Sequence, residues 1–381
     1  MKWSFPIARL FGTQVRIHVT FFLLLAWVGI SAYSAGGAEM TFFAILFVLS
    51  LFLCVLLHEF GHALAAKGYG INTPDITLLP IGGVARLERM PREPRHELVV
   101  AIAGPMVNVV IAAILLLILR VSTPILEISF EFNSFSGFLV NLMRVNVLLV
   151  LFNLVPAFPM DGGRVLRAFL AMKFSYARAT TIAAVIGQSL AFVGGFLGFV
   201  LPAPLLIFIA FFVFLAAGAE ASAARTEEAL SGVKVADAMM TRFQVLQVGD
   251  KIERAVDFLL EGSQTDFPVV DSQDKVVGMV LRNDLMSALR EYGEEGVVRE
   301  AISDCHLTVK ANEPLPETLQ VLNQSKCRTV PVISGEDESL VGLLSLENVG
   351  ELLMIKSALD SHDRRGKGHP FLESGESLLH R

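Results

Sequence analysis

The sequence predicts a polytopic α-helical membrane protein joined to a soluble α/β domain. Of its 381 residues, 53% are hydrophobic and 18% are charged, and the mean hydropathy is +0.59. Such a composition is typical of a membrane protein diluted by a water-soluble part. The long apolar runs end near residue 222, and an internal repeat occupies residues 232–356. We therefore expect a membrane domain over residues 1–224, followed by a soluble domain with two similar halves.

The membrane domain begins with a short segment, residues 1–18, whose partial alternation predicts a small hairpin or an interfacial segment. Six apolar runs then have the length to cross a bilayer; they cover residues 19–34, 42–66, 98–119, 138–158, 178–200 and 204–222. The fourth run contains three asparagines and an arginine and is broken by Pro156 and Pro159. A helix broken inside a bilayer needs protein or water around its freed backbone groups, so this run predicts a cavity.

The positive charges predict the orientation. Lysines and arginines gather before the first run, between the second and third, between the fourth and fifth, and after the sixth. Cytoplasmic loops carry such charges, so we expect a multi-pass cell-membrane protein whose termini and soluble domain are cytoplasmic. The net charge is −6 and no basic face is evident, which argues against nucleic acid as a partner.

The segment between the second and third runs is too apolar for an ordinary surface loop, which is the alternative. Within residues 71–90, Ile76, Leu78 and Val84 favour two short strands around Gly82 and Gly83. We expect a small membrane-associated β element here.

The second run contains the sequence HEFGH, residues 58–62. On a helix, His58 and His62 share a face, so the two imidazoles can bind one metal ion. Glu59 could then take a proton from a water at that ion. A charged side chain near the middle of a membrane helix costs about 2.5–3.5 kcal/mol, which argues against the alternative of a chance match.

A catalytic zinc ion usually has three protein ligands, so one more is needed. Asp161 is prominent in NLVPAFPMDGGR, residues 153–164, because the fourth run brings it back to the expected level of the two histidines. The glycines that follow it permit close approach of the backbone. The alternative is a helix N-cap for the run that starts at Arg164.

Together with AGPMVN, residues 103–108, these motifs resemble the site-2 protease family of intramembrane zinc metalloproteases, over residues 1–222. The resemblance implies a zinc endopeptidase that cleaves transmembrane protein substrates in the lipid bilayer, as in regulated intramembrane proteolysis. It implies one Zn²⁺ per subunit on His58, His62 and Asp161, with Glu59 catalytic. The two other family patterns map to Gly104, Pro105 and Asn108, and to Asn153, Pro156, Pro159, Asp161 and Gly162.

Two asparagines are candidates for contact with the substrate. The amides of Asn108 and Asn153 could orient the scissile carbonyl or stabilise an oxyanion, and an interhelical hydrogen bond is the alternative for each. The strands of residues 71–90 could hold an unwound substrate at their edge.

In the soluble domain, residues 266–285 match residues 329–349, with Pro268 opposite Pro331 and Gly278 opposite Gly342. Each half predicts the order strand, helix, strand, strand, helix. The repeat resembles a pair of CBS domains, residues 232–292 and 296–358, which implies an adenine nucleotide between the halves. Residues 360–381 are charged and Gly-rich and predict a disordered tail.

The nucleotide signature, a Ser or Thr followed three residues later by Asp, is incomplete in both halves. Asp284 lacks the hydroxyl partner, and Ser345 is followed by Asn348. These three residues are candidates for nucleotide binding; the alternative is a pair that only forms a homodimer. The three cysteines, Cys54, Cys305 and Cys327, predict no disulfide framework and fit a reducing compartment.

Two other functions compete with the protease. A membrane transporter or channel gated by CBS domains also carries ionisable groups in its spans, but a permeation path has no need of Glu59. An inactive binding scaffold would be expected to have lost a metal ligand, and His58, His62 and Asp161 are all present.

Overall fold

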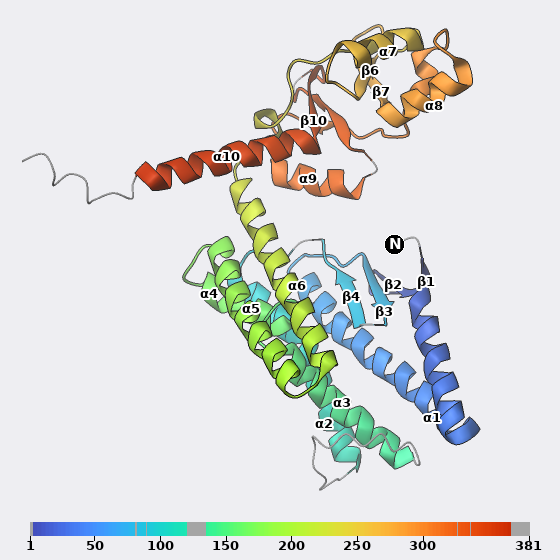
Figure 1. Ribbon diagram of the computed structural model, residues 1–381, viewed down its shortest axis with the longest axis vertical. Helices are drawn as coiled ribbons and strands as arrows, with labels where there is room; N and C mark the ends of the chain where they lie inside the picture. Colours follow the sequence, from blue (N-terminus) through green and yellow to red (C-terminus); the bar gives the residue numbers. More distant parts are fainter. Residues whose placement is uncertain are drawn as a thin grey trace, which may run out of the picture. The chain divides into compact units, whose positions relative to one another are not determined.

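The computed structural model describes residues 3–80, 82–88, 90–119, 135–325, 327–335 and 337–366 (Figure 1). The chain forms two compact units, Met1–Ala224 and Arg225–Arg381.

Unit 1 is built from membrane helices. Five helices in its described residues are long and apolar enough to cross a membrane. They are α1 (Val19–Gly68), α2 (Pro94–Leu119), α3 (Phe135–Asn153), α5 (Tyr176–Val200) and α6 (Pro204–Ala229). α1 folds back at Gly36 and Gly37, and Gly37 has a φ of 71°, which glycine adopts without steric cost. α1 therefore supplies two spans (Figure 1), and the predicted fold with about six spans is confirmed.

The fourth apolar run ends earlier than its predicted limit at residue 158. α3 stops at Asn153, and the chain leaves the helix through residues 154–160 before α4 (Asp161–Ala171) begins. The prolines explain this end, since a proline lacks the N–H that a helix needs and disfavours helical backbone in the residue before it. α4 has 11 residues and is too short to cross a bilayer.

The two predicted β segments join in one sheet. Its strands are β1 (Ser4–Leu10), β2 (Thr13–His18), β3 (Asp75–Leu79) and β4 (Gly82–Arg86), in the order β1-β2-β3-β4. β2 and β3 pair in parallel, and the outer pairs are antiparallel. Val15 of β2 and Ile76 of β3 pack against Phe60 and Ala63 of α1. This apolar contact fixes the sheet beside the part of α1 that contains HEFGH.

Unit 2 has the predicted order of elements in each half. The first half contains β5 (Leu246–Gln247), α7 (Ile252–Glu261), β6 (Phe267–Val270), β7 (Val276–Val280) and α8 (Arg282–Tyr292). The second contains β8 (Val309–Lys310), α9 (Leu315–Gln324), β9 (Thr329–Ile333), β10 (Leu340–Ser345) and α10 (Leu346–Gly366). The tail predicted from residue 360 is wrong in its first residues, because α10 continues to Gly366. Residues 367–381 lie outside the described residues.

The two halves exchange the segments that precede them. Val233 and Val235 lie in the core of the second half, although they come before β5, the first strand of the first half. Val298 and Ala301 lie in the core of the first half. Met240 also exchanges two backbone hydrogen bonds, of 2.8 and 3.0 Å, with Leu343 of β10.

The matched glycines of the repeat lie where these segments cross the sheets. A Cβ at Gly342 would lie 2.5 Å from the sulfur of Met239, and a Cβ at Gly278 would lie 2.7 Å from Ile302 Cγ2. The predicted limits, 232–292 and 296–358, follow the repeat in the sequence. In the structure, the first residues of each predicted domain pack into the core of the other half.

Two cysteines are paired, so the prediction of unpaired cysteines is wrong. Cys305 and Cys327 form a disulfide with their Cα atoms 5.7 Å apart, although they are separated by 22 positions in the sequence. Cys54 is free and buried. The spacing gave no sign of this pair because it forms only when the segment before β8 meets the turn between α9 and β9. The cysteine pattern therefore gives no support to a reducing compartment.

In the first half, hydrogen bonds join the corresponding segments, the one before β5 and the turn between α7 and β6. Gln264 and Cys327 each stand four residues before the matched prolines. The Gln264 side chain accepts a hydrogen bond from the Gln244 N–H at 2.7 Å and donates one to the Gln244 carbonyl at 3.0 Å. Two hydrogen bonds in one half thus correspond to a disulfide in the other.

Loss of this disulfide should destabilise unit 2. The doubly substituted variant Cys305→Ser, Cys327→Ser should lose about 3 kcal/mol, because cross-linking a loop of this size removes about that much unfolded-state entropy. Calorimetric melting of the purified chain would measure the change. A reductant should lower the melting temperature of the parent and leave that of the variant unchanged; an equal shift in both would contradict the prediction.

Candidate metal centre

The three predicted ligands converge on one point from two helices. The Nε2 atoms of His58 and His62, on α1, are 3.1 Å apart, and each lies 3.2 Å from Oδ2 of Asp161 at the start of α4. All three residues are at most 7% exposed. Three atoms that commonly bind metals therefore face one another away from water.

The backbone around α4 explains how Asp161 reaches this point. A Cβ at Gly162 would collide with the carbonyl oxygens of Leu154 and Val155, and one at Gly163 would lie 2.7 Å from the carbonyl carbon of Ala157. Glycine at both positions lets α4 pack directly against the segment that leaves α3. Asp161 is the first residue of α4 and Met160 is its N-cap, so the alternative role of Asp161 as an N-cap is wrong.

Residues of α2 contact the Nδ1 atom of each histidine, on the side of the ring opposite Nε2. His58 Nδ1 lies 2.5 Å from Oδ1 of Asn108, and His62 Nδ1 lies 2.7 Å from the carbonyl oxygen of Val100. A carbonyl oxygen only accepts, so each Nδ1 carries the proton and donates it. Each Nε2 then keeps its lone pair for a metal, an arrangement typical of histidine ligands.

Asn108 is therefore engaged on both sides. Its Nδ2 donates to Oδ1 of Asn146 at 2.8 Å, and Asn146 in turn donates to the carbonyl oxygen of Leu142 at 2.8 Å. This geometry assigns Asn108 to the orientation of His58 and does not favour the predicted contact with the scissile carbonyl. Asn146 was not a predicted site residue, although a polar side chain in an apolar run was a signal for one.

Asn153 is the last residue of α3 and is partly buried. Among the described hydrogen bonds, none joins it to the three candidate ligands. Its contact with the substrate stays a prediction.

Two further glycines fit closely around the site. On α2, a Cβ at Gly104 would collide with the ring of His62, and in β4 a Cβ at Gly83 would lie 2.7 Å from Cγ of Glu59. Glu59 is near enough to His58, His62 and Asp161 to interact electrostatically with all three. β4, an outer strand of its sheet, thus adjoins the candidate base.

The charges around Asp161 favour its anionic form. Burial would raise the pKa of this carboxyl, and the positive charge of Arg164 lowers it. Arg164 Nη1 lies 3.8 Å from Asp161 Oδ1. A buried carboxylate that stays ionised is suited to bind a cation.

This donor set fits zinc. Two neutral imidazoles and one carboxylate, with all three donor atoms within 4.8 Å of one another, match the three-ligand pattern of catalytic zinc sites, which leave a fourth position open.

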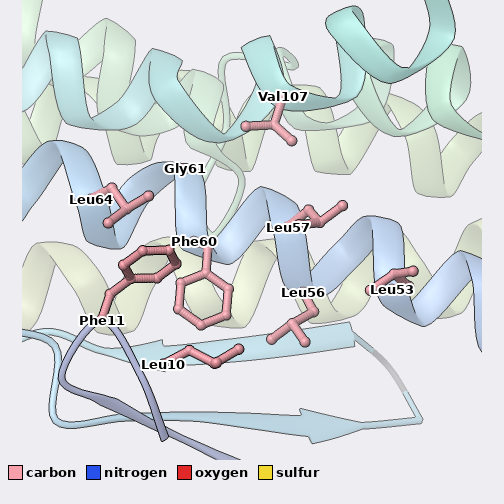
Figure 2. Close-up of a pocket in the computed structure, with 9 residues that line it drawn as sticks. All are labelled: Leu10, Phe11, Leu53, Leu56, Leu57, Phe60, Gly61, Leu64 and Val107. Carbon is pink, nitrogen blue, oxygen red and sulfur yellow. The ribbon is translucent and has the colours of Figure 1, made fainter. Parts of the chain in front are cut away.

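A separate groove lies on a different face of α1 (Figure 2). It has a volume of about 310 Å³ and is lined by apolar residues: Leu10, Phe11, Leu53, Leu56, Leu57, Phe60, Gly61, Leu64 and Val107. At 100° per residue, Leu57 and Leu64 point away from the face that carries His58 and His62. The groove contains none of the candidate metal ligands.

Comparisons with known proteins identify the family. The sequence profile of Peptidase family M50 matches residues 46–134 and 121–194. A zinc metalloprotease of Methanocaldococcus jannaschii is 36% identical over 304 residues, which are 78% of this chain and 85% of that protein. The chain belongs to peptidase family M50, the site-2 protease family. As a member, it is a zinc metalloprotease, which argues against a transporter or a channel.

Further comparisons extend over both units. A protein of Synechocystis sp. with a provisional zinc metalloprotease name is 28% identical over 387 residues, which are 94% of this chain and 97% of that protein. The solved site-2 protease of M. jannaschii is 36% identical, with a TM-score of 0.43 over 57% of this chain and 95% of that one. The profile of the CBS domain matches residues 235–291 and 298–354. This M50 protease therefore carries a CBS domain pair.

In the CBS pair, the structure brings two of the three nucleotide candidates together. Ser345 Oγ donates to Asn348 Oδ1 at 2.7 Å, and the Asn348 N–H donates to Ser345 Oγ at 3.2 Å. Asp284 lies in the first turn of α8, in the other half, and shares no described interaction with them. Asp266 and Thr329, which match in the repeat and were not predicted, connect the halves through a hydrogen bond of 2.5 Å.

The variant Gly104→Ala should weaken zinc binding. Its new methyl group would displace the His62 ring, and disturbing the shell behind a ligand typically lowers metal affinity by about 10- to 100-fold. Competition with a chelator would measure the affinity. Gly194→Ala is the control, because a Cβ at Gly194 of α5 meets only Ala210 Cβ at 4.0 Å. Equal zinc affinities of the two variants would count against the assignment of His62.

Proposed function

We propose that this M50 protease is an intramembrane endopeptidase that cleaves transmembrane protein substrates. In the proposal, His58, His62 and Asp161 hold one zinc ion and Glu59 is the general base. The observation that carries it is the convergence of three buried ligand atoms at one point on membrane helices, with a carboxylate beside them. Peptide hydrolysis needs these groups, whereas a binding scaffold needs no base.

Each side chain has a distinct task in this proposal. A zinc ion held by His58, His62 and Asp161 would supply Lewis acidity toward a water and the scissile carbonyl. Asn108 and Val100 fix the tautomers of the histidines and keep both Nε2 atoms directed at the ion. Glu59 accepts the proton of the attacking water and passes it to the leaving amine.

The sheet supports a role in substrate binding. A transmembrane helix satisfies its own backbone hydrogen bonds, so a peptide bond reaches the site only after the helix unwinds. The outer strand β4 passes Glu59 at Gly83, and a strand edge offers replacement hydrogen bonds to an extended peptide. We propose that the substrate is held against β4.

The variant Glu59→Gln should retain zinc and lose activity. Glutamine keeps the size of the side chain but cannot accept the proton, and general-base catalysis contributes about 10²- to 10⁴-fold. The measurement is cleavage of a single-span membrane protein in proteoliposomes, with zinc content determined on the same sample. Glu39→Gln is the matched control, since Glu39 is an exposed acid on the same helix. Turnover by Glu59→Gln at the control rate would refute the proposed base.

We further propose that an adenine nucleotide binds between the CBS halves, near Asp284, Ser345 and Asn348, and changes the cleavage rate. Two observations support it: Ser345 and Asn348 form a preorganised polar pair at the start of α10, and the halves are interlocked. A ligand shifts a conformational equilibrium only by its differential affinity for the two states, and about 1.4 kcal/mol changes the ratio tenfold.

Calorimetry of the full-length protein with ATP, ADP and AMP should detect binding, which Asp284→Ala should weaken. Asp257→Ala, an exposed acid on α7, is the control. Nucleotide added outside inside-out vesicles should change the cleavage rate, and nucleotide added outside right-side-out vesicles should not, because we propose that the pair is cytoplasmic. Absence of both heat and rate change at millimolar nucleotide would leave the pair as a homodimerisation device.

A further inference from the structure

One buried arginine joins three helices, and one of them, α4, begins with Asp161. Arg167 of α4 is 1% exposed. Its Nε donates to Glu97 Oε1 at 2.7 Å, and its Nη2 lies 2.5 Å from the same oxygen. Its Nη1 donates to Glu220 Oε1 at 2.6 Å. Glu97 is in the first turn of α2, and Glu220 belongs to α6.

The guanidinium also contacts two aromatic rings. Its central carbon lies 5.1 Å from the centre of the Phe158 ring and 4.9 Å from that of Tyr176. Phe158 belongs to the segment just before Asp161, and Arg167 belongs to the helix that Asp161 begins. Arg167 therefore holds both the segment that delivers Asp161 and the helix that continues from it.

All three candidate ligands are connected to α2. Asn108 and Val100 of α2 hold the two histidines, and Glu97 of the same helix holds α4 through Arg167. We infer that Arg167 is a positioning residue that aligns Asp161 with His58 and His62 by means of the Glu97 ion pair. This inference rests on the proposed ligand set.

The two carboxylates that contact Arg167 differ in their exposure to solvent. The Glu97 side chain is 2% exposed, whereas that of Glu220 is 41% exposed. Water can replace part of the Glu220 contact, so without Glu97 the buried guanidinium would keep only the more exposed Glu220 as a counter-charge. Glu97 is therefore the main partner, and Glu220 adds a weaker connection from α6, the helix in which unit 1 ends.

The test compares zinc affinity with stability in Arg167→Lys. Lysine keeps the charge but not the planar guanidinium, whose Nε donates to Glu97 while its Nη1 donates to Glu220. We expect a drop of about 10- to 100-fold in zinc affinity, as for other residues behind a ligand, and an altered visible absorption spectrum of the Co²⁺-substituted protein. Glu220→Gln should lose less affinity than Arg167→Lys. Arg178→Met removes an exposed arginine stacked on Phe174 of the same unit and should change neither reading.

An Arg167→Lys protein with a lower melting temperature but parental zinc affinity and cobalt spectrum would overturn the inference, since that is the result of a merely structural ion pair. Should Arg167→Lys fail to fold, Glu97→Gln gives the same test, because it keeps the shape of the partner and removes its charge. His62→Ala separates this outcome from a failure of the proposed function. Stoichiometric zinc in that variant would mean that the ligand set itself is wrong.

Discussion

The close approach of α1 and α2 is the constraint on which the metal centre depends. A Cβ at Gly61 of α1 would lie 2.7 Å from the carbonyl oxygen of Ala103, and Gly104 of α2 leaves room for the His62 ring. At this separation, Asn108 reaches His58 and the Val100 carbonyl reaches His62. A larger side chain at either glycine would move the helices apart and break the hydrogen bonds that fix the imidazoles. The chemistry thus depends on two positions that carry no functional group.

The sequence was most informative where the geometry is local. His58 and His62 share a face because of the helical repeat, and the glycines after Asp161 indicated a close approach of the backbone. The strand pair at β3 and β4 was also predictable, since a segment that is both apolar and glycine-containing suits neither a loop nor a span. In each case the signal lay within a few residues of the feature that it predicted.

The rest depended on contacts between segments far apart in the chain. The hydrogen bond from Asn108 to Asn146 spans 38 positions, and that from Arg167 to Glu97 spans 70. The disulfide and the exchange of segments between the CBS halves have the same origin. Arg167 looks like an ordinary cytoplasmic charge in the sequence, and only the packing of α2, α4 and α6 makes it a buried one.

The interlocking of the CBS halves determines which half the chain from α6 reaches first. After α6, the chain contributes Leu230, Val233 and Val235 to the core of the second half. These residues precede β5, the first strand of the first half. A displacement of the end of α6 would therefore pull first on the second half, which the disulfide fastens. The chain from the membrane domain therefore enters the core of the second CBS half before it forms the first, which is the reverse of the order of the halves in the sequence.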